Sequence, residues 1–191
     1  SVDLLLTDPY YSDAVMMLEK AKILSDIISN PVDFQPKIVK GISTRFDEYT
    51  AILSPDQEFA FFTRRSLKKT KQDITESSVE EFTFSKKDGQ GYFDEGSAMR
   101  YPFNRSENEG GPSITIDNNV LYFTKCIRNT NGKNNCDLYY TKRTVNPNGG
   151  YNWSKVQEFS KKISKKDSWD SQPTVSADGQ TIIFASNRKG G

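Results

Sequence analysis

Three acidic residues recur at one fixed spacing in this chain. Glu48, Glu109 and Asp170 are spaced 61 residues apart, and each opens the predicted innermost strand of its repeat, so that symmetry would place them around one end of a central channel. A ring of such carboxylates could hold a cation, or the basic or hydroxylated part of a ligand. Alternatively, each carboxylate could accept hydrogen bonds from backbone N–H groups of the neighbouring repeat. We favour this second, structural interpretation.

Two cysteines flank a short polar loop. Cys126 and Cys136 are the only cysteines of the chain, and the sequence IRNTNGKNN separates them. If the flanking strands form a hairpin, the two residues lie opposite each other at a separation compatible with a disulfide. A disulfide would indicate an oxidising compartment such as the periplasm. Two unpaired thiols are the alternative, and we favour the disulfide.

The composition argues against catalysis. The chain contains no histidine, which excludes an imidazole base, a Ser-His-Asp triad and an imidazole metal site. A glycosidase needs two carboxylates in different environments, whereas the three repeated carboxylates look equivalent. We therefore predict that the chain is not an enzyme and that it needs no cofactor and no metal.

The charge distribution does not favour nucleic acid as a partner. The chain has 26 Lys and Arg against 25 Asp and Glu, a net charge of +1, and nucleic-acid binding usually needs a basic face. We expect the basic runs 64–71 and 161–168 to be solvated, with an acidic partner or lipid headgroups as the alternative. Charged residues interrupt the apolar stretch 14–28, so no membrane span is predicted. We expect Trp153 and Trp169 to fill gaps between repeats rather than to form a sugar platform.

Internal repetition is the most informative pattern of the sequence. The segments 52–64, 113–125 and 174–188 align without gaps. Further positions keep the same 61-residue spacing, including Asp56, Asp117 and Asp178, and Phe62, Phe123 and Phe184. Several positions that hold one period over two intervals indicate a repeat architecture.

Each repeat predicts the same order of strands and turns. A strand leads into an Asp-containing turn, and a second, more apolar strand follows. A further strand is predicted at 80–86 and at 136–142, and the glycine-rich stretches 90–96 and 148–156 would lead into an outer strand. Four antiparallel strands in a unit of period 61 indicate β-propeller blades. Such a long period predicts long surface loops, the most obvious at 66–78.

The N-terminal region predicts a helix instead. Residues 9–29 form an amphipathic pattern, with Asp8 as the N-cap, Pro9 in the first turn and a stop at Asn30-Pro31. The pattern Tyr11-x2-Ala14-x3-Leu18-x2-Ala21 resembles the second helix of a tetratricopeptide repeat, although an ordinary amphipathic helix is an equal alternative. The predicted domains are therefore a tetratricopeptide-like region at 1–30 and a β domain at 31–191.

The turn sequences carry a family resemblance. SPDQEFAFFTRR (54–65) and DSQPTVSADGQTIIFASNRKGG (170–191) resemble the TolB-like, or WD-like, propeller repeat. Gln57 and Asn118 stand where that repeat usually has Gly, and Gln tolerates positive φ poorly, so the first turn could differ. Together with the helix, the chain resembles Bacteroidetes envelope proteins that join tetratricopeptide repeats, a TolB-like propeller and a C-terminal OmpA-like domain. We expect it to be a fragment with about two and a half blades.

The resemblance implies a binding role. Some members of that group are associated with type IX secretion, and their OmpA-like domain binds peptidoglycan. The expected function is a non-catalytic scaffold of a periplasmic, outer-membrane-associated complex. Its partners would be envelope proteins or other parts of the same chain, and any contact with peptidoglycan would come from a C-terminal domain outside these residues. The alternative is a glycan-binding or polysaccharide-processing propeller.

Overall fold

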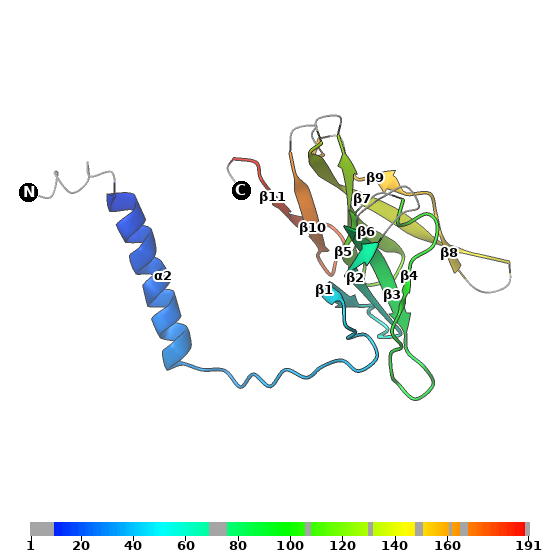
Figure 1. The fold of residues 1–191 in the computed structure, drawn as a ribbon, viewed down its shortest axis with the longest axis horizontal. Coiled ribbons are helices and arrows are strands. Elements are labelled where there is room, and N and C mark those ends of the chain that lie inside the picture. Colours follow the sequence, from blue (N-terminus) through cyan, green and yellow to red (C-terminus); the bar gives the residue numbers. More distant parts are fainter. Residues whose placement is uncertain are drawn as a thin grey trace, which may run out of the picture. The chain divides into compact units, whose positions relative to one another are not determined.

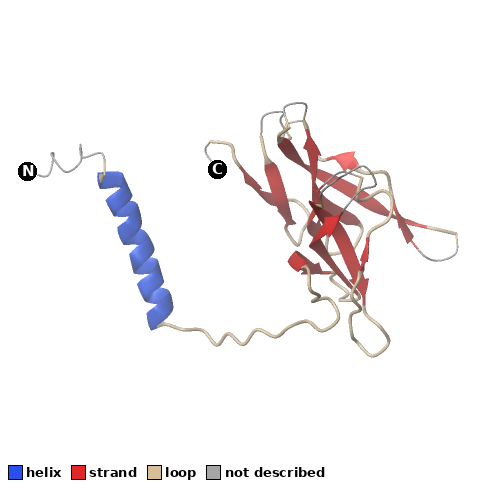
Figure 2. Cartoon of the chain, viewed as in Figure 1, coloured by secondary structure: helices blue, strands red, loops and turns tan. Residues whose placement is uncertain are grey.

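The computed structural model describes residues 10–68, 76–105, 108–129, 132–147, 151–160, 162–164 and 168–189. The chain divides into two compact units, Ser1–Lys37 and Ile38–Gly191. The first contains a helix and the second is built of strands (Figures 1 and 2). In the described part of the chain, no helix has the length and apolar character needed to cross a membrane.

The helix α2 spans Tyr11–Ser29. It ends at Ser29, two residues before Pro31, as predicted, because proline disfavours helical geometry in the residue that precedes it. Asn30 closes this end: its backbone N–H donates to the carbonyl oxygen of Asp26 at 2.9 Å, and its side-chain amide donates to the Asp26 carboxylate at 2.8 Å. The predicted N-terminal residues Asp8 and Pro9 lie outside the described residues.

The second unit is mainly β. Its strands are β1 (Asp47–Leu53), β2 (Phe59–Lys68), β3 (Ser77–Lys86), β4 (Ser97–Ala98), β5 (Asn108–Ile114), β6 (Val120–Arg128), β7 (Asn134–Val145), β8 (Tyr151–Trp153), β9 (Gln157–Glu158), β10 (Asp170–Val175) and β11 (Ile182–Ser186). The predicted loop at 66–78 is too long, because β2 continues to Lys68 and β3 begins at Ser77; residues 69–75 lie outside the described part. The predicted glycine-rich turn at 148–156 contains the strand β8.

The strands form three successive groups. β1–β4 make an antiparallel meander, which we call repeat 1; β5–β9 make repeat 2, in which both β8 and β9 pair with β7; β10 and β11 make repeat 3. Repeats 1 and 2 share a mixed sheet, because β3 and β5 meet in parallel through the single pair Glu80–Asn108. The strand order runs from β1 to β8 without returning to β1, so this sheet is open.

The first strand of each repeat has the same irregularity. The pairing register shifts between Tyr49 and Ile52, between Gly110 and Ser113, and between Ser171 and Thr174. A residue with positive φ lies inside each shift: Thr50 at 50°, Gly111 at 60° and Gln172 at 53°. These positions are 61 residues apart, so the period of the sequence is also a period of backbone conformation.

The turn after this strand also repeats. In repeat 1, Asp56 accepts hydrogen bonds from the Ser54 hydroxyl and from the backbone N–H of Glu58, while Phe59 N–H donates to Ser54 Oγ at 2.9 Å. Thr115 with Asp117, and Ser176 with Asp178, form the same bonds. Gln57 adopts φ 60°, close to Asn118 at 59° and Gly179 at 72°. The replacement of glycine therefore leaves the geometry of the first turn unchanged.

The largest apolar core lies between repeats 1 and 2. Phe61 and Phe82 of repeat 1 face Leu121 and Phe123 of repeat 2, and Phe103, from the segment between the repeats, is buried with them. The Phe82 and Phe123 rings stack at 5.7 Å, and Phe103 meets Phe123 edge to face at 5.4 Å. The inner faces of two successive repeats thus form one core.

A hydrogen bond between neighbouring repeats occurs twice. Thr63 Oγ1 accepts the backbone N–H of Gly111 at 3.0 Å, and Thr124 Oγ1 accepts the backbone N–H of Gln172 at 2.9 Å. Donor and acceptor at the second boundary each lie 61 residues after their counterparts at the first. At the first boundary the approach is so close that a Cβ on Gly110 would lie 2.0 Å from Thr63 Oγ1. Glycine is therefore required there by contact between the repeats.

The hydrogen bond between Thr63 and Gly111 leads to a prediction about stability. Thr63 is 2% exposed, and Thr63→Val would keep its shape while leaving the buried Gly111 N–H without an acceptor. We expect Thr63→Val to lower the free energy of unfolding by about 1–3 kcal/mol, as measured by urea denaturation. Thr63→Ser keeps the hydroxyl, so its free energy of unfolding should fall by less. Equal losses in the two variants would contradict a role for the hydrogen bond.

Candidate functional site

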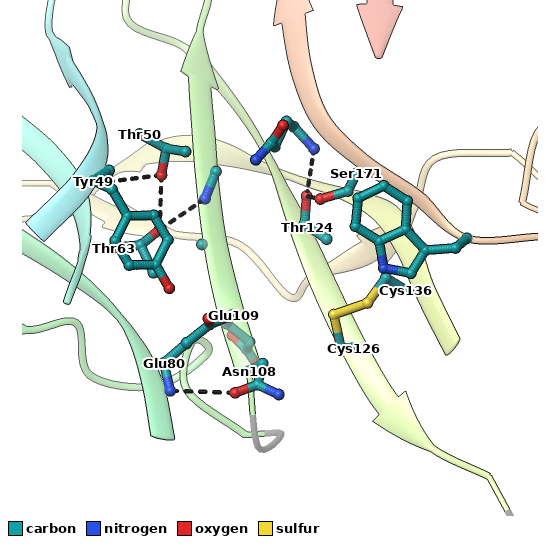
Figure 3. Close-up of a pocket in the computed structure, with 14 residues that line it drawn as sticks. Tyr49, Thr50, Thr63, Glu80, Asn108, Glu109, Thr124, Cys126, Cys136 and Ser171 are labelled. Atoms are coloured by element: carbon teal, nitrogen blue, oxygen red, sulfur yellow. Dashed lines mark hydrogen bonds between the residues drawn. A yellow bond between two sulfur atoms is a disulfide. The ribbon is translucent and has the colours of Figure 1, made fainter. Parts of the chain in front are cut away.

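A cleft crosses the three repeats where β1, β5 and β10 begin (Figure 3). Its volume is about 360 Å³. It is lined by Tyr49, Thr50, Thr63, Glu80, Asn108, Glu109, Gly110, Gly111, Thr124, Cys126, Cys136, Trp169, Ser171 and Gln172. All three repeats therefore contribute to its wall.

Glu109 is the one predicted carboxylate that lines the cleft. Its side chain is buried, and it accepts the backbone N–H groups of Asn104 at 2.7 Å and Arg105 at 2.8 Å. Lys125 Nζ lies 3.8 Å from the same carboxylate. Two N–H donors and a cation compensate for the loss of hydration at this buried charge.

The other two carboxylates have similar partners but do not line this cleft. Glu48 accepts the backbone N–H of Thr44 at 3.2 Å, the Thr44 hydroxyl at 2.6 Å and Arg64 Nε at 2.9 Å. Asp170 is fully buried and accepts the Ser168 hydroxyl at 2.8 Å and Arg188 Nη2 at 3.0 Å. Glu48, Glu109 and Asp170 are thus held separately, each at the start of its own strand.

The source of these donors differs from the sequence-based prediction. We expected N–H groups from a neighbouring repeat, but the donors lie two to five residues before each carboxylate, in the segment that leads into the same strand. The chain bends back at this point, which brings its own preceding residues closest to the carboxylate. Each carboxylate therefore fastens a connecting segment to a strand.

The cationic partners of the three carboxylates were not predicted from the sequence. Arg64 and Lys125 are 61 residues apart on β2 and β6, so their spacing was a usable signal. The repeat-equivalent residue in β11 is Ser186, and Arg188 supplies the cation instead. This two-residue displacement hides the third partner from a search by period.

Tyr49 and Glu80 give the cleft its remaining polar character. The phenolic oxygen of Tyr49 is buried and has no hydrogen-bond partner among the described residues. Burial, and then the nearby Glu80 carboxylate, raise the pKa of Tyr49, so the phenol stays neutral at physiological pH. Sequence reasoning could not find Tyr49, because its repeat equivalents are Gly110 and Ser171.

The cysteine pair forms part of the wall. Cys126 and Cys136 lie directly opposite each other on β6 and β7, with a Cα–Cα distance of 4.0 Å, and are joined by a disulfide. The hydroxyls of Thr50 and Thr63 bond to each other within repeat 1, and those of Thr124 and Ser171 bond across the boundary between repeats 2 and 3. Most polar groups of the cleft are therefore engaged in holding the repeats together.

Of the remaining predicted features that the structure describes, Trp169 alone lies at the cleft. Trp169 lines the cleft and is 38% exposed, whereas Trp153 packs against the core of repeats 1 and 2. In the basic run 64–71, the residues that form ion pairs with carboxylates are Arg64, Arg65 and Lys68. Much of the run 161–168 lies outside the described residues. Among the described residues, no group of three His, Cys, Asp or Glu could hold a metal ion.

The Glu48 site predicts a pH dependence of stability. Burial alone would raise the pKa of Glu48, but hydrogen bonds from Thr44 and Arg64 outweigh it and lower this pKa below the usual 4.5. A carboxyl whose pKa is lower in the folded state stabilises the fold above its unfolded pKa, and this contribution is lost as pH falls through the folded pKa. We expect Glu48→Gln to reduce the free energy of unfolding by about 1 kcal/mol at pH 7, and by much less near pH 3.

Urea denaturation between pH 7 and pH 3 would check this prediction. Glu58→Gln is the matched control, because Glu58 is an exposed turn residue whose backbone N–H, rather than its carboxylate, forms the turn hydrogen bond. A loss at Glu48→Gln that is independent of pH would show that the charged form of Glu48 is not what stabilises the fold.

Comparison with protein-family models, with curated proteins and with solved structures finds no match to this chain. The TolB-like resemblance therefore rests on the turn sequences alone. The function has to follow from the geometry of the repeats and of their clefts.

Proposed function

We propose that this chain is a non-catalytic scaffold module of a bacterial envelope complex, built from successive β-propeller blades that present their loops to protein partners. The observation that carries the proposal is the twofold occurrence of one contact between repeats, Thr63 with Gly111 and Thr124 with Gln172. Stacking of like units by a like contact is how propellers and other repeat proteins are built.

The apolar surfaces support the same proposal. Repeat 1 buries one face against repeat 2, and the four antiparallel strands of repeat 1 match the make-up of a blade. On repeat 3, Ile183 is 70% exposed at the position equivalent to Tyr122 and Phe61. A further blade or a partner protein would bury this surface.

The partners of the acidic residues support a binding role rather than catalysis. Glu48, Glu109 and Asp170 each have hydrogen-bond donors and a cationic partner. Groups that are held in this way fix the backbone, whereas a general acid or a nucleophile needs access to a substrate. Loops and exposed repeat faces, rather than these carboxylates, would contact the partner.

The disulfide supports the proposed location. Disulfides persist in oxidising compartments such as the periplasm and are rare in the cytosol. Together with the resemblance to envelope proteins, the Cys126–Cys136 bond favours a periplasmic, outer-membrane-associated complex, with type IX secretion or peptidoglycan-linked assemblies as the settings that the resemblance suggests.

Thiol trapping in living cells would test this proposal. We expect that N-ethylmaleimide added to intact Bacteroidetes cells leaves Cys126 and Cys136 unmodified until a reductant is added. The tagged chain should fractionate with the outer membrane and cross-link to envelope proteins. The double variant Cys126→Ser/Cys136→Ser gives the labelling background. Modification of both thiols without reductant, together with recovery of the chain in the cytosolic fraction, would contradict the proposal.

A further inference from the structure

A second cavity, of about 600 Å³, lies between residues 97–103 and the strand β8 of repeat 2. Six aromatic residues line it: Phe61, Phe84, Tyr101, Phe103, Tyr151 and Trp153. We propose that this cavity binds an acidic saccharide, whose pyranose rings pack on the aromatic side chains and whose carboxylate pairs with Arg100. This site goes beyond the scaffold role and does not depend on it.

The aromatic wall is held in place before any ligand arrives. Trp153 meets Phe103 edge to face at 6.2 Å and Tyr151 edge to face at 5.9 Å. Phe103 is itself buried in the core. An aromatic face carries partial negative charge, which suits the C–H groups on the face of a sugar ring. A wall fixed in this way loses little conformational entropy on binding.

Polar groups of the cavity are left without partners. The side chains of Arg100 and Asn152 are exposed to solvent and form no hydrogen bond or ion pair with the described residues, and the indole N–H of Trp153 donates to none of them. Arg100 is the one charged side chain among the described residues of the lining. A guanidinium binds a carboxylate through two parallel hydrogen bonds, so the unpaired charge favours an anionic ligand.

The segment that carries Arg100 is clamped at both ends. The side-chain amide of Asn104 donates to the carbonyl oxygens of Met99 and Phe82, both at 2.9 Å, and its oxygen accepts the Phe82 N–H at 2.8 Å. Glu109 in turn accepts the Asn104 N–H. The repeated carboxylate therefore positions the binding segment, and Tyr101 within that segment is 76% exposed.

A saccharide fits this cavity better than an extended peptide. Peptides that bind at a sheet edge gain affinity from a row of backbone hydrogen bonds. The outer strands that border the cavity are β4, with two residues, and β8, with three, which is too short for such a row. The apolar lining is aromatic apart from Ala98 and Met99, and Met99 is buried. Flat rings with a few polar groups suit a sugar.

Titration of the 191-residue chain with trigalacturonic acid tests the proposal. We expect saturable binding by calorimetry and a change in tryptophan fluorescence. Trp153→Phe should remove the fluorescence change, whereas Trp169→Phe, at the only other tryptophan, should keep it. Neutral galactotriose should bind at least about tenfold more weakly, because it lacks the carboxylates.

Two matched arginine variants test whether Arg100 supplies the positive charge that binds the saccharide. Arg100→Ala should weaken trigalacturonic acid binding about tenfold or more. Arg45→Ala, which removes another exposed arginine beside an aromatic ring, should not change it, and circular dichroism would verify that both variants fold. The proposal is overturned by an absence of saturable binding, by equal effects of the two variants, or by equally tight binding of hexaglutamate, which would identify an acidic peptide instead.

Discussion

Thr63 accepts a hydrogen bond from the Gly111 N–H across the boundary between two repeats, and the rest of the β unit is arranged around this contact. The N–H is available because Gly111 has positive φ, which interrupts the pairing of β5 with β6 and turns this donor out of the ladder. The absence of a Cβ at Gly110 permits the close approach. The same irregularity at Gln172 serves the next boundary. A local break in pairing thus becomes the means by which the repeats are joined.

The two cavities differ in how their polar groups are used. In the cleft at the starts of β1, β5 and β10, the threonine and serine hydroxyls bond to one another, and Glu109 is surrounded by donors. Most of the polar groups in this cleft therefore bond to other protein groups and hold the repeats together. In the aromatic cavity, Arg100 and Asn152 have no such partners. More polar side chains of the second cavity are thus free of partners among the described residues, even though the repeated carboxylates pointed to the first cavity.

Sequence reasoning succeeded where the physics is local. The Asp-containing turns, the strands around them and the end of the helix before Pro31 follow from turn chemistry and proline sterics, which act within a few residues. The position of Cys126 opposite Cys136 needed only a hairpin of the expected register. Period 61 also located Glu48, Glu109 and Asp170 at equivalent places, each at the start of its strand.

Features that depend on which strands lie side by side were not predictable. The Tyr49 phenol and the Glu80 carboxylate meet in a cleft to which three repeats contribute, and no spacing connects them. The glycine-rich stretch 148–156 was predicted to lead into an outer strand; β8 begins inside that stretch, where it pairs with Arg143 to Val145 of β7. The aromatic cavity joins Tyr101 to Trp153 across a repeat boundary. Trp153 has an aromatic equivalent in Tyr92, but the positions equivalent to Tyr101 are Lys40 and Lys162, so the period does not connect the two residues.

Amide hydrogen exchange, followed residue by residue by NMR, tests the central claim that one contact stacks successive repeats. If it does, the Gly111 and Gln172 amides should both be protected to the level of the β2–β3 ladder, because each is bonded to a threonine hydroxyl at a closed boundary. Exchange of these two amides at the rate of exposed turn residues would contradict the claim, because the boundaries would then be open in solution.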